Sequence, residues 1–236
     1  MTTRLVYLTL CAIPFALVGV AAGDEPNSNL KRIVEDWGGR VVLEKHGSDT
    51  VADVYLEHFP LDGREITNAA LKQIAPFPET RSLTIDSRLI TDAGLGELKS
   101  LARLQWLTIR CPRVSGIGLK DLGQCKSLWK IAIMDSPISE EGIKQLRQFK
   151  ALRSLHLLGV EMTEAKMKAL GEIKDLRDLL LHDCQVTDGG VKHLANLQHL
   201  RTLCLTRNEV SEAARKELTE KLPHCNIIWR TPPAAR

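Results

Sequence analysis

ITDAGLGELKSLARLQWLTIRCPR begins at Ile90 and is followed without a gap by four further segments of the same design. These segments are VSGIGLKDLGQCKSLWKIAIMDSP, ISEEGIKQLRQFKALRSLHLLGVE, MTEAKMKALGEIKDLRDLLLHDCQ and VTDGGVKHLANLQHLRTLCLTRNE, and they start at Val114, Ile138, Met162 and Val186. Every step is 24 residues long. A fixed period of this length is the signature of a stacked repeat protein, in which each unit is one small piece of secondary structure.

Each unit combines two hydrophobic periods. Counted from zero at the start of a unit, positions 5, 8, 11 and 14 are apolar and three apart, whereas positions 17 and 19 are two apart. The unit from Ile138 shows this with Ile143, Leu146, Phe149 and Leu152, and then Leu155 and Leu157. The first spacing is typical of a buried helical stripe and the second of one face of a strand. The pattern therefore predicts a helix followed by a strand, with a core that forms only when units stack.

The first residues of each unit indicate helix capping rather than catalysis. Position 1 is always Ser or Thr, position 2 is acidic in four of the five units, and position 4 is often Gly. A hydroxyl side chain accepts a hydrogen bond from the free amides of a first helical turn, and a carboxylate complements the helix dipole there. Because these residues recur in every unit, we interpret them as structural.

The run LxxLxLxxx, seen in LRSLHLLGV (Leu152–Val160) and LRTLCLTRN (Leu200–Asn208), resembles the leucine-rich repeat. The preceding part of each unit resembles the 24-residue GALA-like variety of secreted bacterial proteins, which is related to the cysteine-containing type. The resemblance implies an α/β fold, a right-handed horseshoe-shaped solenoid with a parallel sheet on its concave face and helices on its convex face. It also implies a ladder of Asn or Cys side chains after the strands. Here Asn208 and Cys184 fit that place, but Val160, Ser136 and Pro112 do not, so we expect an incomplete ladder.

The repeat frame extends in both directions and sets the predicted domains. Divergent units start at residues 66 and 210, which gives seven units in a repeat domain over 66–231. Residues 24–65 are predicted to form an N-terminal cap with a helix at 30–37 and strands at 40–45 and 51–58, and residues 232–236 a disordered tail. Residues 1–23 have Arg4, an apolar run and a small-residue end, as in a signal peptide. We expect a secreted, periplasmic or cell-envelope protein; an uncleaved signal that anchors the chain in a membrane is the alternative.

Few features of the sequence indicate catalysis or the binding of a cofactor, metal or nucleic acid. The net charge of +3 is small and evenly spread, which argues against nucleic-acid binding. No phosphate-binding glycine loop, GxSxG or HExxH motif is present, so we expect neither a catalytic site nor a cofactor. His156, His182 and Cys204 share one face, but their Cα atoms are about 8 Å apart, too far for a compact metal site. Beyond Cys11 there are five cysteines, expected to be reduced and structural, with a Cys204–Cys225 pair left open.

In this kind of repeat, positions 16, 18 and 20 of each unit line the concave surface. The predicted binding residues are apolar in the centre, with Trp106, Met134, Leu158 and Leu180, and polar around it, with Arg110, Lys130, His156 and His182. An apolar centre with a polar rim is typical of a protein-binding site, although an ordinary, partly apolar sheet is the alternative.

Position 15 forms a second row, with Arg81, Arg153, Arg177 and Arg201, and with Gln105 and Trp129 between them. Neighbouring units bring these side chains close, so we expect a cation–π contact between Trp129 and Arg153. The row either attracts an anionic partner or is solvated and neutralised by carboxylates such as Asp175 and Asp178.

These features favour a non-enzymatic, monomeric binding module that recognises an unidentified protein or peptide on its concave face. The alternative is a carbohydrate-binding, cell-envelope-binding or structural surface protein that uses the arginine row or Trp106. An enzyme is the third and least favoured class, because no catalytic constellation stands outside the repeat pattern.

Overall fold

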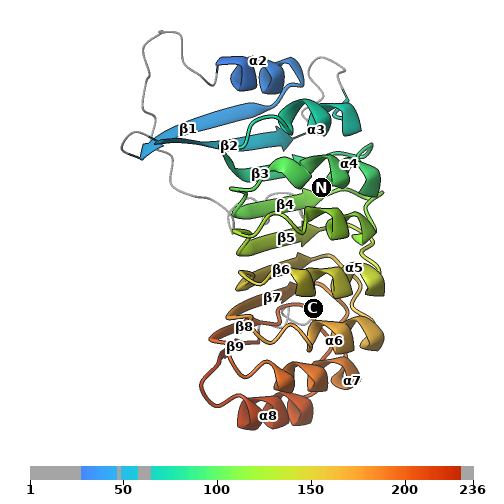
Figure 1. The fold of residues 1–236 in the computed structure, drawn as a ribbon. Coiled ribbons are helices and arrows are strands. Elements are labelled where there is room, and N and C mark those ends of the chain that lie inside the picture. Colours follow the sequence, from blue (N-terminus) through green and yellow to red (C-terminus); the bar gives the residue numbers. More distant parts are fainter. Residues whose placement is uncertain (1–27, 47–48, 58–64, 230–236) are drawn as a thin grey trace, which may run out of the picture.

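The computed structural model describes residues 28–46, 49–57 and 65–229 (Figure 1). The predicted signal peptide at 1–23, parts of the predicted cap (24–27, 47–48 and 58–64) and the predicted disordered tail at 232–236 lie outside the described residues. Within the described part, nine strands form one sheet in the order β1 to β9. Only the first pair is antiparallel, and every later strand is parallel to the one before it.

A helix and an antiparallel strand pair precede the repeats. Helix α2 (Ser28–Asp36) leads into β1 (Arg40–His46), which pairs with β2 (Asp49–Glu57). Gly38 follows the helix with φ of 73°, the left-handed conformation that commonly ends a helix and that glycine adopts without strain. β2 then pairs in parallel with β3 (Thr80–Asp86), so this strand pair continues directly into the repeat sheet.

Each repeat then contributes a helical segment and a strand. The strands are β4 (Trp106–Arg110), β5 (Lys130–Met134), β6 (Ser154–Leu158), β7 (Asp178–His182), β8 (Thr202–Cys204) and β9 (Asn226–Ile228). The α-helices are α3 (Asn68–Ile74), α4 (Asp92–Gly96), α5 (Glu140–Gln145), α6 (Glu164–Leu170), α7 (Asp188–Val191) and α8 (Glu212–Lys221). Short 3₁₀ helices complete several units, at Glu97–Ser100, Ile117–Leu122, Leu146–Gln148 and Lys192–Asn196.

One unit departs from the predicted helix. The unit from Val114 has only the 3₁₀ segment Ile117–Leu122 in the helix position. Gly116 precedes it with φ of 85°, outside the right-handed helical region. Gly116 stands where the other four central units have the Asp or Glu that begins the α-helix, so its left-handed conformation prevents an α-helix from starting there.

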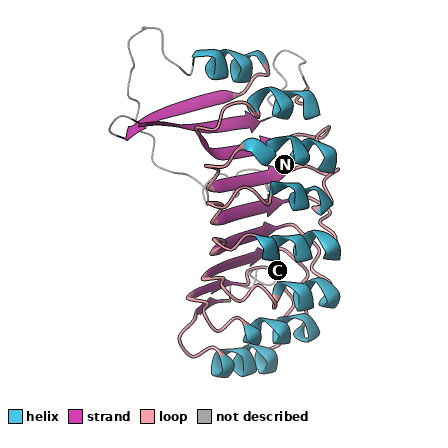
Figure 2. Ribbon diagram, in the orientation of Figure 1, coloured by secondary structure: helices cyan, strands magenta, loops and turns pink. Residues whose placement is uncertain are grey.

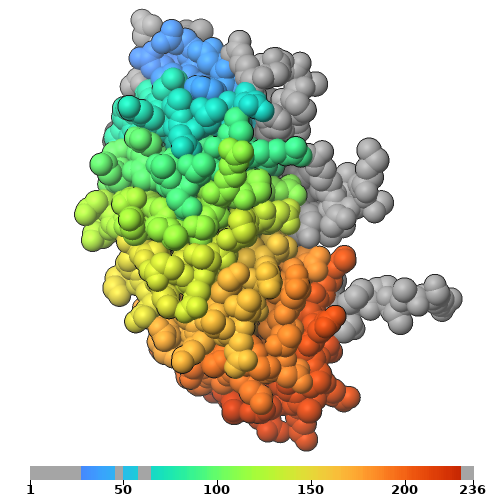
Figure 3. All heavy atoms as spheres, turned by 90° about the vertical axis from the view of Figure 1, so that its right-hand side faces the viewer, coloured from blue at the N-terminus to red at the C-terminus, as the bar shows by residue number. Residues whose placement is uncertain are grey.

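The repeat register aligns equivalent residues in space. Leu107 pairs with Ile131, Ile131 with Leu155, and Leu155 with Leu179, each 24 residues further along the chain. These side chains belong to one continuous hydrophobic core that runs from Leu30 to Leu222. The strands lie on one side of this core and the helices on the other (Figure 2). Viewed from the helix side, the units follow one another as bands in chain order (Figure 3). The predicted α/β solenoid is confirmed.

Capping follows the prediction in part and adds a contact between units. The side-chain oxygens of Ser139 and Ser211 accept from amides in their own helices, whereas Thr91 does not. The acidic position 2 also bonds the next unit: Asp92 accepts from the Ser115 amide at 2.9 Å and the Ser115 hydroxyl at 2.8 Å. Asn68–Thr91 and Asp188–Ser211 repeat this link. In these three units position 2 therefore joins neighbouring units, whereas Glu140 at the same position pairs with Lys144 of its own helix.

The ladder after the strands is more complete than the sequence predicted. Asn208 accepts from the Cys184 and Val186 amides and donates to the Leu181 carbonyl. Ser136, which was not expected to contribute, accepts from the Cys111 amide at 2.9 Å. In the unit with Pro112, the Sγ of the buried Cys111, one residue earlier, donates to the Ile85 carbonyl at 3.8 Å. The unit with Val160 contributes a buried apolar side chain there, so the ladder is interrupted only at that point among these five units.

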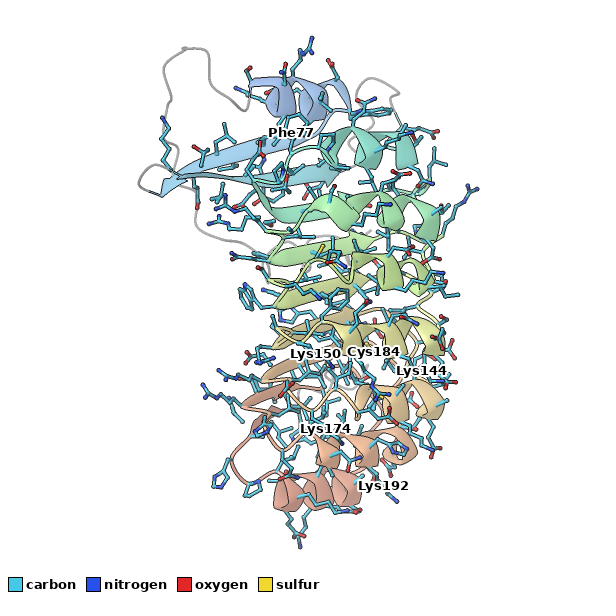
Figure 4. All side chains as sticks on the ribbon, viewed as in Figure 1. Phe77, Lys144, Lys150, Lys174, Cys184 and Lys192 are labelled. Atoms are coloured by element: carbon cyan, nitrogen blue, oxygen red, sulfur yellow. The ribbon has the colours of Figure 1, made fainter. Side chains whose placement is uncertain are left out.

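All five cysteines in the described part of the chain are free thiols, and Cys204 and Cys225 are not paired. Cys184 lies inside the stack, where its Sγ donates to the Leu157 carbonyl at 3.2 Å (Figure 4). Burial raises the pKa of Cys111 and of Cys184 to about 12, and that of Cys125 to about 11. Since the thiolate is the reactive form, burial disfavours reactions at these three thiols.

No helix in the described ranges combines the length and the apolar character needed to cross a membrane.

Candidate binding surface

The strand register places the predicted binding residues in three rows on the side of the sheet that faces away from the helices, here called the sheet face. The first row contains Trp106, Lys130, Ser154 and Asp178 on successive strands. The second contains Thr108, Ala132, His156, Leu180 and Cys204, and the third contains Met134, Leu158 and His182. Because strand neighbours are about 4.8 Å apart, side chains in one row contact each other directly.

An apolar patch, formed by Ala132, Met134, Leu158 and Leu180, lies on the sheet face apart from the main core. Leu158 is 2% exposed and Met134 9%, whereas Leu180 is half-buried. Met134 and Leu158 therefore form the floor of the patch, and Leu180 is its accessible part. Ala132, which the sequence analysis did not single out, completes the floor because it lies in register between Thr108 and His156.

Trp106 is not a member of this patch, contrary to the arrangement expected from the sequence. It lies in a different row, and its ring is covered by the neighbouring Lys130, whose Nζ is 4.1 Å from the ring centroid. This cation–π contact fixes the orientation of the indole. The Trp106 Nε1 is buried and has no hydrogen-bond acceptor within the described residues. A buried donor without an acceptor lowers the stability of the fold, so such atoms are rare in native proteins.

Arg110 lies at the end of β4 and is held by acidic neighbours. Its Nε and Nη2 both donate to Asp135 Oδ2, at 3.0 and 2.6 Å, and Asp86 lies 3.7 Å from its Nη1. Asp135 follows β5 with φ of 44°. Arg110 is therefore a half-buried, paired cation at the edge of the sheet face.

The two histidines of the predicted rim are held in the neutral form. Burial, reinforced by the nearby Lys130 charge, lowers the pKa of His156 to about 4. Burial also lowers the pKa of His182, whose Nδ1 lies in hydrogen-bond contact with the Thr206 hydroxyl. His156 Nε2 lies 3.3 Å from Ser154 Oγ, but a general base should titrate near the working pH. This Ser–His pair is therefore poorly suited to nucleophilic catalysis at neutral pH.

No group of three or more potential His, Cys, Asp or Glu ligands comes together in the part of the chain that the structure describes. His156, His182 and Cys204 lie on three successive strands of the sheet face.

The arginine row differs from the prediction at one contact. Trp129 and Arg153 are neighbours, since the Arg153 amide donates to the Trp129 carbonyl at 2.9 Å. The predicted cation–π contact between them does not form. Arg153 Nη1 instead donates to the carbonyls of Lys150 and Leu152, both at 2.9 Å. The Trp129 side chain remains 43% exposed.

The fold class follows from the stacked units. They share one length and stack in register, each has a helical segment behind its strand, and a polar ladder joins the loops. The chain is a leucine-rich-repeat solenoid. Among solved structures it is similar to a leucine-rich-repeat protein from Leptospira interrogans, with 20% identity and a TM-score of 0.45, over 66% of this chain and 44% of that one.

Two internalins from Listeria monocytogenes are also similar. The first has 14% identity and a TM-score of 0.37, over 70% of this chain and 58% of the internalin. The second has 18% identity and a TM-score of 0.49, over 89% of this chain and 88% of the internalin. This leucine-rich-repeat chain thus matches only about half of two of these three proteins. No protein-family model and no curated protein sequence matches it.

Proposed function

We propose that this protein is a non-enzymatic binding module that engages a protein or peptide segment through its sheet face, outside the cytoplasm. The observation that carries the proposal is the Trp106 indole. Its ring is oriented by Lys130 and is half-buried, so part of the indole is open to a partner. The buried Nε1 is out of a partner's reach, and a bound segment would contact the accessible part of the ring.

The surroundings of Trp106 support the same function. Leu180 offers an apolar contact, and neutral His156 and His182 lie beside it on the neighbouring strand and on its own strand. Tryptophan and arginine are enriched among the residues that dominate binding energies. Because the repeat stack holds these side chains in place before binding, little conformational entropy is lost when a partner binds.

The proposal is tested by selecting binding peptides from a random library on the full-length chain and measuring their affinity by fluorescence polarisation. Trp106→Phe, which replaces the indole with a smaller ring, should weaken binding about fivefold, because it removes contact area worth roughly 1 kcal/mol. Leu180→Ala should weaken it by a similar factor through lost apolar area.

The matched control is Trp129→Phe, which makes the same change at an exposed tryptophan that is not on the sheet face. It should leave affinity unchanged. If peptides bind the Trp106→Phe and Leu180→Ala variants as tightly as the parent chain, the sheet face is not the binding surface.

Two further parts of the proposal concern the ends of the chain. Residues 1–23 act as an export signal, and N-terminal sequencing of the exported protein should give a chain that starts after Ala22 or Gly23. An intact N-terminus in a membrane fraction would instead show that the signal is retained as an anchor. Residues 24–65 act as a cap on the repeat domain over 66–231, and the module is a monomer.

A further inference from the structure

The arginines at position 15 of their units lie at the amino ends of the parallel strands, on adjacent units. The Arg177 amide donates to the Arg153 carbonyl at 2.8 Å, and the Arg201 amide donates to the Arg177 carbonyl at 2.7 Å. This backbone ladder holds the three residues one strand spacing apart, about 4.8 Å. Three cations at this spacing repel one another unless an anion lies between them.

The fourth arginine of the row, Arg81, is neutralised by carboxylates. Arg81 donates from Nε and Nη2 to the two oxygens of Asp53, at 3.2 and 2.8 Å, and from Nη2 to Glu44 at 2.8 Å. Among the described residues, Arg177 and Arg201 make no comparable ion pair or side-chain hydrogen bond, and both are exposed.

These arginines line a pocket of about 460 Å³ that is open on one side. Its polar lining consists mainly of Arg153, Arg177, Arg201, His199, His224 and Asp175, and the buried Leu200 forms part of its floor. The three arginines and the one aspartate of the lining together carry a net charge of two positive. The volume lies within the range of about 300–1,000 Å³ that small-molecule sites occupy.

We propose that this pocket binds the phosphate group of a small phosphate monoester. A guanidinium presents parallel N–H donors that match two oxygens of a phosphate, and the net charge of the pocket complements a dianion. Arg153 is held by its bonds to the Lys150 and Leu152 carbonyls, so one cation of the site is already oriented. His199 and His224 also line the pocket and carry ring nitrogens that can form hydrogen bonds. The remaining volume accommodates the organic part of the ligand. This site is separate from the sheet face and does not depend on the function proposed for it.

The test uses the full-length chain and two probes, inorganic phosphate and glycerol phosphate, with binding measured by calorimetry at low ionic strength. Both probes should bind, and the double variant Arg177→Ala/Arg201→Ala should weaken binding at least tenfold. Arg177→Lys/Arg201→Lys, which keeps the charge but not the fork of donors, should give an intermediate affinity. Vesicles of phosphatidylglycerol form a third arm, which distinguishes a lipid phosphate from a soluble one.

The control is Arg147→Ala, which removes an exposed arginine paired with Glu172 at 2.7 Å and outside the pocket. It should leave phosphate binding unchanged. Circular dichroism should show that every variant keeps its fold. Absence of binding to both phosphate probes overturns the proposal, as does equal weakening by Arg147→Ala, which would show only a response to overall charge. Vesicle binding that is lost in the double variant, with the soluble probes weaker, would assign the same pocket to a lipid phosphate.

Discussion

Arg81 and Arg201 occupy the same position in their repeats, yet their surroundings differ at the two ends of the solenoid. At the N-terminal end, the β1–β2 pair contributes Asp53 and Glu44, and Arg81 is neutralised in a half-buried position. At the C-terminal end, the equivalent edge is an exposed, positively charged pocket. A repeat position thus has no fixed role. It is structural at Arg81, where a flanking segment supplies carboxylate partners, whereas Arg201, where the repeats continue, pairs with no carboxylate among the described residues.

The same contrast holds for the core. At the N-terminal end, Leu30 and Val34 of α2 are fully buried against the repeats. At the C-terminal end, Ile227 and Trp229 are only partly buried, and Arg215 covers the Trp229 ring at 5.4 Å from its centroid. The first end is closed by apolar packing, and the last described strand keeps part of its apolar surface accessible.

The largest expected effect on stability tests how completely each end of the core is covered. Leu30→Ala should lower the free energy of unfolding by about 2–5 kcal/mol, because it opens a cavity under α2. Ile227→Ala should cost only about 1 kcal/mol, since a half-buried side chain loses less apolar area and leaves no closed cavity. Urea denaturation followed by circular dichroism measures both. Equal losses would show that the two ends are closed equally well.

The next effect separates the two acidic neighbours of the arginine row. Asp53→Ala should cost roughly 1–3 kcal/mol, because Asp53 is buried and its removal leaves the Arg81 guanidinium without its main partner. Asp175→Ala, which removes an exposed carboxylate from the pocket edge, should stay within about 0.5 kcal/mol. The same urea experiment applies, and a loss at Asp175 as large as that at Asp53 would contradict the assignment of a free pocket.

The repeat period made most of the core predictable. Residues such as Leu155 and Leu179 follow from spacing alone, because equivalent positions in stacked units must meet. The partners of Arg81 did not follow, since Asp53 comes from a segment outside the repeat, 28 residues earlier. The Asp92–Ser115 link also escaped prediction: it depends on how a loop places one unit's carboxylate over the next unit's amide.

The site was predictable to a similar degree. Strand alternation placed Met134, Leu158 and Leu180 on one face correctly. It gave no information on which of two neighbours Trp106 would contact, and the cation–π partner proved to be Lys130. Rotamers decide such contacts, and the residue pattern does not encode them. The binding role of these residues remains a prediction.

A smaller effect concerns the links between units and depends on pH. Burial alone would raise the pKa of Asp92, but the Gly118 and Ser115 amides and the Ser115 hydroxyl donate to its carboxylate and lower the pKa overall. A group with a lowered folded-state pKa stabilises the fold above its ordinary pKa of 3.8 and loses that contribution as the pH falls through the folded value.

Asp92→Ala should therefore cost about 1 kcal/mol at pH 7, the usual value of a lost cap. The difference from the parent chain should shrink as the pH falls below about 4. Urea denaturation at several pH values measures it, with the exposed Asp121→Ala as the control. A difference that stays constant from pH 7 to pH 3 would mean that the carboxylate charge does not stabilise the link.

The smallest expected effect on stability compares Arg81 with Arg201. Arg81→Ala should destabilise the protein, because it strands Asp53 without its cation. Arg201→Ala should change stability by less than about 0.5 kcal/mol and should tend to raise it, since it removes repulsion from Arg177 one strand away. Salt screens that repulsion, so the gain should disappear as the ionic strength rises from about 0.01 to about 0.5 M. If Arg201→Ala is destabilising at both salt concentrations, Arg201 is held by a partner in the fold as Arg81 is, and the contrast between the two ends of the row fails.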